Sequence, residues 1–200
     1  MDSTPVSAML SQVLDAIDVA NRADPRPALD DNGKEQPEAY LYGLRMTSEL
    51  ERLFGNSASD VLRISARGQH IERWLLKRSD YPEGRTGYLK WRRDQGRAHG
   101  DRLTGLMADA GYAPETCARA GVLLRKEGIK RDSEVQQLED IICFTFLKWY
   151  FEPFAAKHPP EKVLDIVSKT ARKMSTQARA QVLSEFDLPG ELKDAVKAAR

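Results

Sequence analysis

The sequence predicts an all-α protein, a single helical domain over residues 1–200 built around one central buried helix. Apolar residues recur at steps of three and four in many segments, which is the spacing of one face of a helix. Glycine and proline residues separate these segments at intervals typical of helices. We find no pair of segments with the alternating pattern of adjoining strands, and no internal repeat. These observations together favour a fold made of helices.

The N-terminal half contains three predicted helices. Val6–Val19 carries apolar residues on one face and ends at a turn-rich segment. Pro37–Phe54 opens with a proline, which helices accept at their first position. The third helix begins at a serine cap, Ser57 or Ser59, and continues to about Leu76.

The remaining helices follow a loop at residues 78–87, which contains proline and glycine. A long helix covers Tyr88–Ala110, and another covers Pro114–Lys126. The helix that opens at Ser133 is apolar on nearly every side and is expected to be the central buried helix. Pro153 is expected to kink or end it. Shorter amphipathic helices begin at Pro160, Ser175 and Pro189.

The composition is that of a soluble globular protein. Of the 200 residues, 41% are hydrophobic and 30% are charged, and the net charge of +1 gives no reason to expect an extended nucleic-acid or membrane surface. We see no N-terminal signal sequence and no run of about 20 apolar residues, so we expect a cytoplasmic protein without a membrane partner. Cys117 and Cys143 lack metal-ligand or disulfide spacing and are expected to be buried thiols.

The segment Arg67–Arg102 combines arginine, aromatic and histidine side chains at unusual density, and basic residues outnumber acidic ones between residues 63 and 102. This local excess predicts a small anionic ligand, because guanidinium groups match phosphate and carboxylate in geometry. We expect one pocket that contains His70 and His99. The residues expected to bind the substrate are Arg67, Arg73, Arg85, Tyr88, Arg92, Tyr42 and Arg45.

Histidine and carboxylate side chains on separate helices predict a site for one divalent metal ion of unknown identity. The expected ligands are His70, His99, Asp140 and Glu38. A metal-bound water would act as the nucleophile, and Glu72 or Glu49 would accept its proton. For each of these residues the alternative is a structural role, such as an exposed ion pair or a carboxylate in the first turn of a helix.

Four long blocks of the sequence are distinctive: GQHIERW, RSDYPEGRTGYLKWR, LLRKEGIKRD and LEDIICFTFLKWYFEPFAAKH. These blocks resemble a bacterial and fungal family known as domain of unknown function 4202. The resemblance extends over nearly the whole chain. It implies membership of that family and does not imply a particular activity.

A weaker similarity is to the HD-domain superfamily of metal-dependent phosphohydrolases and oxygenases. It implies that His70 corresponds to the histidine of the His-Asp doublet, His99 to a later histidine, and Asp140 to the late aspartate. The sequence departs from this pattern at Ile71, which stands where the aspartate of the doublet belongs. No histidine precedes His70, so Glu38 or another residue of its helix would fill the first ligand position.

Three functions are compatible with these features. The first is a metal-dependent, HD-like enzyme, a phosphohydrolase or oxygenase that acts on a small phosphorylated or anionic substrate such as a nucleotide. The second is a helical module that binds a nucleotide or an RNA end through aromatic stacking and phosphate contacts, without catalysis. The third is a helical scaffold or interaction protein. We place the enzyme first, and self-association into a homo-oligomer is left open.

Overall fold

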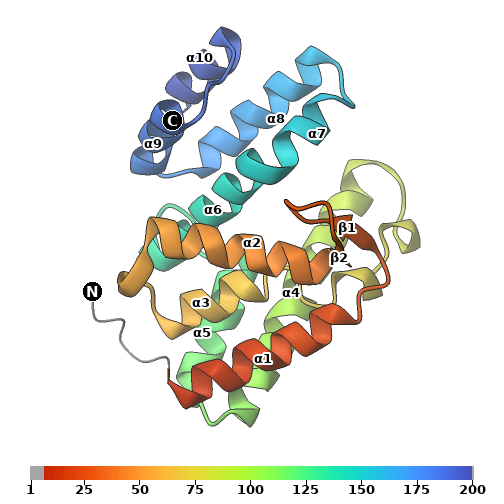
Figure 1. Cartoon of the computed structure of the whole chain (residues 1–200), viewed down its shortest axis with the longest axis vertical. Helices are drawn as coiled ribbons and strands as arrows, with labels where there is room; N and C mark the ends of the chain where they lie inside the picture. The colour runs from red at the N-terminus through yellow and green to blue at the C-terminus, as the bar shows by residue number, and fades with distance from the viewer. Residues whose placement is uncertain (1–6, 200) are drawn as a thin grey trace. The chain divides into compact units, whose positions relative to one another are not determined.

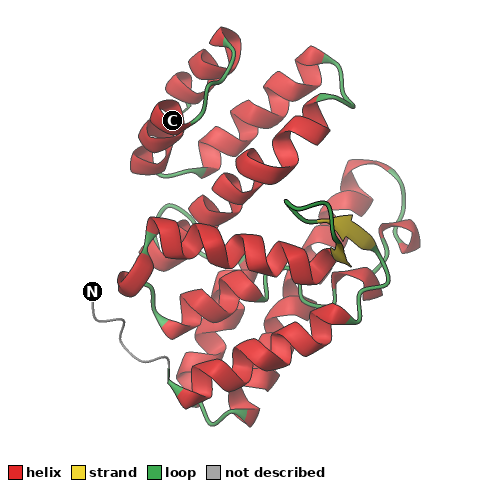
Figure 2. Cartoon of the chain, viewed as in Figure 1, coloured by secondary structure: helices red, strands yellow, loops and turns green. Residues whose placement is uncertain are grey.

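The computed structural model describes residues 7–199, and 74% of the chain is helical (Figures 1 and 2). The predicted all-α class is therefore confirmed. The chain divides into two compact units, one that ends at Glu127 and one that begins at Gly128. The expectation of a single domain stays a prediction. Among the described residues, no helix is long and apolar enough to cross a membrane.

The N-terminal unit contains five α-helices and one small hairpin in the part that the structure describes. The α4 helix packs against α5 along much of its length, and α3 packs against α1, α2 and α5. The core of this unit contains fully buried leucines from α3, α4 and α5, namely Leu62, Leu103 and Leu123. The elements are α1 (Ala8–Arg22), β1 (Pro27–Leu29), β2 (Glu35–Pro37), α2 (Glu38–Leu53), α3 (Asp60–Arg67), α4 (Gly84–Asp109) and α5 (Pro114–Arg125).

The expectation of no strand pair is wrong in one place. Strands β1 and β2 pair in an antiparallel manner, with Ala28 opposite Gln36 (Figure 2). The Asp30 side chain closes the turn by accepting hydrogen bonds from the backbone N–H groups of Asn32 and Lys34. Each strand has three residues, which is too short to display the alternation by which strands are detected in a sequence.

One predicted helix start differs from the observed one, and another lies outside the described residues. The α1 helix begins at Ala8, because the Ser7 hydroxyl accepts a hydrogen bond from the N–H of Leu10 and caps the first turn. The predicted start at Val6 lies outside the described residues. The α4 helix begins at Gly84, four residues before the predicted Tyr88.

The third helix is shorter than predicted. It ends at Arg67, and residues 68–76 form a series of turns that includes a 3₁₀ turn at Arg73–Leu75. The apolar residues that predicted a helix to Leu76 are still present, but Gly68 brings the chain against α4. A Cβ atom at position 68 would lie 2.5 Å from the side chain of Leu103. We call residues 68–76 the Arg73 turn, because it positions that side chain.

The second unit contains the helix that was predicted to be buried. Leu138, Ile141 and Phe144 of α6 are at most 1% exposed. The helix widens into a π-helical turn at Phe146–Tyr150 and continues through Pro153 to Ala155. The wider turn precedes the proline, whose ring does not fit a regular α-helical turn. The helix does not end at Pro153, and the predicted kink stays a prediction. The other elements are α6 (Ser133–Thr145), α7 (Phe151–Ala155), α8 (Pro160–Lys173), α9 (Thr176–Glu185) and α10 (Gly190–Ala198).

Candidate functional site

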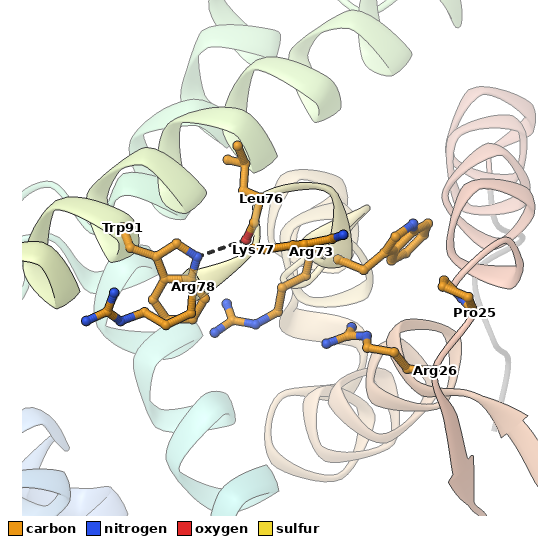
Figure 3. A pocket seen from close by; sticks show the side chains of 8 residues that line it. Pro25, Arg26, Arg73, Leu76, Lys77, Arg78 and Trp91 are labelled. Atoms are coloured by element: carbon orange, nitrogen blue, oxygen red, sulfur yellow. Dashed lines mark hydrogen bonds between the residues drawn. The ribbon is translucent and has the colours of Figure 1, made fainter. Parts of the chain in front are cut away.

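The Arg73 turn is held in place by two side chains of α4. The Gln95 Nε2 group donates to the carbonyl oxygens of Arg73 and Leu76, at 2.9 and 3.0 Å. The Trp91 indole N–H also donates to the Leu76 carbonyl, at 2.9 Å (Figure 3). These carbonyl groups would accept backbone hydrogen bonds if the third helix continued. They accept hydrogen bonds from side chains of α4 instead, which fixes the backbone at Arg73.

Glu72, the residue before Arg73, adopts a left-handed backbone conformation with φ 51° and ψ 27°. Its N–H donates to the Asn21 side chain of α1 at 3.2 Å, and its carboxylate pairs with Arg102 of α4 at 3.2 Å. A non-glycine residue in this conformation is strained by about 1–2 kcal/mol, and such strain persists where surrounding contacts determine the backbone. Residues of this kind concentrate at binding sites, so the turn is a candidate for function.

A pocket of about 550 Å³ lies beside the Arg73 turn (Figure 3). Four of the residues that line it are basic, two are tryptophans and none is acidic. The guanidinium group of Arg73 lies over the ring of Trp91, 4.7 Å from its centroid. We call this the outer pocket, and its lining residues are Pro25, Arg26, Arg73, Trp74, Leu76, Lys77, Arg78 and Trp91.

The basic side chains of the outer pocket differ in how their charge is compensated. Arg26 forms a two-point contact with the Asp24 carboxylate, at 2.9 and 2.8 Å, and pairs with Glu38 at 3.2 Å. Arg73, Lys77 and Arg78 form no ion pair with a carboxylate within residues 7–199. Burial is the main cause that lowers the pKa of Arg73; Tyr42 and, more weakly, Glu38 raise this pKa, whereas the charges of Arg92 and Arg26 lower it. The pocket therefore carries an excess of positive charge that a bound anion would compensate.

Further basic groups surround His70, next to the same arginine. The His70 ring stacks on Tyr42 of α2, with ring centroids 3.7 Å apart and planes inclined by 16°. Burial lowers the pKa of His70 well below its usual range, and the charges of Arg73, His99, Lys126 and Arg92 lower it further. The ring is thus expected to be neutral at pH 7. We call His70, His99, Arg92 and Lys126 the inner cluster.

His99 lies on the buried face of α4, with its ring centroid 6.4 Å from that of His70. His99 is 4% exposed, and its Nε2 atom has no hydrogen-bond partner among the described residues. Burial and Arg73 lower its pKa to about 4, although a hydrogen bond with the backbone of Ile71 acts in the opposite direction. An unpartnered buried nitrogen next to several basic groups is a second sign of a ligand or an ordered water.

The structure brings several predicted residues to this site. The inner cluster contains three of them, His70, His99 and Arg92. Tyr42 stacks on His70, and the charge of Arg73 acts on His70. Tyr88 and Arg85, on the first turns of α4, are exposed. Tyr88 lies against Trp91, with ring centroids 6.0 Å apart, and its hydroxyl accepts a hydrogen bond from Arg92 at 3.4 Å. Arg85 has no interaction partner in the described part of the chain.

Other predicted residues take part in ion pairs elsewhere in the unit. Arg67 forms two contacts of 2.6 Å with Asp18, and Arg45 pairs with Asp31 at 3.0 Å. Glu49 is 0% exposed and accepts hydrogen bonds from Arg52, its neighbour on α2, at 2.8 and 2.5 Å. Glu72 forms an ion pair with Arg102, and Glu38 forms one with Arg26. These contacts correspond to the structural alternative that the sequence left open.

Asp140 belongs to the second unit. Its Oδ1 atom accepts hydrogen bonds from the Ser175 N–H at 2.8 Å and from the Gln136 amide at 3.0 Å. Burial raises its pKa in spite of these bonds. The carboxylate therefore stabilises the start of α9, where Ser175 is the capping residue.

The side chains around His70 do not fit a divalent metal ion. Within residues 7–199, no group of three or more His, Cys, Asp or Glu side chains could hold a metal ion. The charged neighbours of His70 are the basic groups of the inner cluster and Arg73, without a carboxylate among them. A cation brought into this cluster would be repelled by them, whereas an anion would be attracted.

Sequence reasoning missed three contributions to the site. Arg26 follows the end of α1, far from the histidine-rich segment, and the sequence contains no sign that it lines the same pocket. Lys77 and Arg78 follow the predicted third helix directly, and neither was among the residues predicted to bind the substrate. The role of Gln95 depends on backbone carbonyls of the Arg73 turn, which only the folded chain brings into reach.

The fold and the site define a helical protein whose N-terminal unit has a basic pocket with aromatic walls. The chain belongs to the family described as Domain of unknown function (DUF4202), whose sequence profile matches residues 11–196. The predicted resemblance to this family is therefore confirmed. No curated protein and no solved structure matches the chain. The similarity to the HD-domain superfamily stays a prediction.

Proposed function

We propose that the N-terminal unit binds a small phosphorylated ligand such as a nucleotide. The observation that carries the proposal is the set of basic side chains around Arg73, with no acidic residue in the lining of the outer pocket. Uncompensated charges of one sign in a partly buried site oppose folding, and a bound phosphate would offset that cost. Arginine suits this role because its planar guanidinium group can contact two phosphate oxygens at once.

Trp74 supports a ligand that also has a planar ring. Trp91 already lies under Arg73 and donates its N–H to Leu76. Trp74 lines the same pocket and has no ring contact, cation–π contact or hydrogen bond within the described residues. Stacking of a nucleobase on an aromatic side chain contributes about 1–3 kcal/mol. We therefore assign the phosphate to the basic side chains and the base to Trp74.

The test is thermal unfolding and calorimetric binding with adenosine monophosphate. A ligand at 100 times its dissociation constant stabilises the native state by about 2.7 kcal/mol, which corresponds to roughly 5–11 °C for a chain of this size. Arg73→Gln should abolish this shift. Arg97→Gln is the matched control, because it removes the same charge from an exposed position of α4 that has no interaction partner among the described residues. Equal loss of binding in both variants would contradict the proposal.

A short single-stranded RNA is the comparison ligand. If the pocket holds one nucleotide, an RNA oligomer should bind no more tightly than the monophosphate, and the affinity should change modestly with salt. An affinity that increases with RNA length and falls steeply with salt concentration would instead favour the RNA-binding module that the sequence left open.

The metal-dependent enzyme expected from the sequence stays a prediction, and it has an independent test. Protein purified without chelator can be analysed for bound metal, alongside His70→Ala and His99→Ala. Stoichiometric metal that both substitutions remove would support that enzyme. Because the neighbours of His70 are basic, we expect the metal content to be below stoichiometric in all three proteins.

A further inference from the structure

Arg73 lies between two groups of basic side chains. Its guanidinium group lies over the ring of Trp91, the residue before Arg92 on α4, and it lines the outer pocket together with Arg26. The charges of Arg92 and Arg26 both act on it. It is itself a lining residue of the outer pocket and the charge that acts most strongly on His70. Figure 3 shows the side chain of Arg73 between those of Arg26 and Arg78. A ligand bound at Arg73 is therefore within reach of cations on two sides.

The uncompensated charge exceeds what one phosphate group can offset. Arg73, Lys77, Arg78 and Arg92 form no ion pair with a carboxylate in the described part of the chain. The Arg78 guanidinium group donates to the backbone carbonyl of Tyr81 at 2.9 Å, which orients it without neutralising it. A phosphate monoester carries a charge of about −1.5 to −2 at pH 7. Four cations thus correspond to about two phosphate groups.

We infer that the natural ligand carries two linked phosphate groups, as in a nucleoside diphosphate, with one at the inner cluster, one in the outer pocket and Arg73 between them. The inference rests on the proposed function and specifies its ligand class. Arg92 contacts the inner phosphate, and Arg78, with Lys77, contacts the outer one. The unpartnered Nε2 of His99 lies next to the inner phosphate and becomes a donor if the ring takes up a proton there.

The inference assigns separate tasks to the two arginines, which allows a test by substitution. Arg78→Gln removes a cation from the outer pocket, and Arg92→Gln removes one from the inner cluster. Arg92 is exposed and Arg78 is half-buried, and neither has an ion pair to lose, so both variants should fold. Arg97→Gln again controls for the loss of one positive charge. Melting temperatures without ligand verify that all three variants are folded.

The measurement is calorimetric titration of each protein with adenosine monophosphate and adenosine diphosphate at one salt concentration. Wild-type protein should bind the diphosphate at least about tenfold more tightly, since a charge-assisted contact is worth that much or more. Each substitution should weaken diphosphate binding by about tenfold. Only one of them should weaken monophosphate binding to the same extent, because a single phosphate occupies one of the two positions.

The failures of the inference and of the proposed function are distinguishable. If the diphosphate binds within threefold of the monophosphate, or if both ligands lose affinity equally in both variants, the two-phosphate assignment is wrong while phosphate binding stands. If neither nucleotide binds to the wild-type protein, the proposed function itself fails. If Arg97→Gln has the same effect as the other two variants, the attraction is a general effect of charge and the assignment is wrong as well.

Discussion

Replacing Gln95 by leucine should loosen the Arg73 turn and weaken ligand binding. Gln95 is 3% exposed, and its amide donates to the carbonyl oxygens of Arg73 and Leu76. Leucine has a similar size but no donor, so Gln95→Leu removes both hydrogen bonds without leaving a large cavity. The Leu76 carbonyl keeps the hydrogen bond from Trp91. The Arg73 carbonyl oxygen loses the hydrogen bond from Gln95. This carbonyl belongs to the residue whose side chain we assign to phosphate binding.

The expected magnitude follows from these contacts. Two buried neutral hydrogen bonds contribute about 2 kcal/mol together, and a buried carbonyl left without a donor costs about 1–3 kcal/mol more. Removing the Gln95 Oε1 atom, which has no partner among the described residues, returns about 1 kcal/mol. We therefore expect a net loss of about 2–4 kcal/mol in the free energy of unfolding and about tenfold weaker binding of adenosine diphosphate.

Urea unfolding followed by tryptophan fluorescence measures this loss in the relevant unit. Trp74 and Trp91 lie in the N-terminal unit and Trp149 in the second, so the experiment uses a Trp149→Phe background. Gln95→Glu serves as the contrasting variant. It places a carboxylate against two carbonyl oxygens and should destabilise more than leucine. If Gln95→Leu changes stability by less than about 0.5 kcal/mol and leaves diphosphate binding unchanged, Gln95 does not hold the turn and our reasoning is refuted.

Two further predictions concern pH and packing. The folded pKa of His99, about 4, lies below its ordinary value of 6.5, so the unfolded chain binds a proton first as the pH falls. The contribution of His99 to stability should therefore be complete above pH 6.5 and should fall by about 3 kcal/mol between pH 6.5 and 4, and the lowered pKa of His70 adds a loss in the same direction. Arg73 and His70 are the charged or titratable groups around the ring, and urea unfolding of His99→Gln should show a flatter profile than that of the wild type. Gly87→Ala should cost about 3 kcal/mol or more, because its Cβ would lie 1.8 Å from the Pro82 carbonyl oxygen. Gly105→Ala, with open space around its Cβ, should instead be neutral or stabilising by up to about 1 kcal/mol, and equal melting temperatures for the two variants would contradict this account.

The sequence by itself determined the helical class and the position of most helices, because apolar periodicity and capping residues are local properties of the chain. It also pointed to the segment that supplies most residues of the outer pocket, since the density of arginine and aromatic residues between Arg67 and Arg102 is visible without a structure. The end of the third helix was predicted wrongly, because close contact of Gly68 with Leu103 and hydrogen bonds from α4 replace the local preference for a helix.

Only the tertiary structure decided which arginines lack a carboxylate that compensates their charge. Arg67 and Arg73 lie six residues apart and look equivalent in the sequence. Asp18, on α1, lies against Arg67 and neutralises it. Arg73 faces Trp91, Arg26 and Arg92 and has no carboxylate within ion-pair distance among the described residues. The net charge at a site is the sum over charged side chains from distant segments of the chain. Folding decides which of these side chains come together, so this sum cannot be read from the sequence.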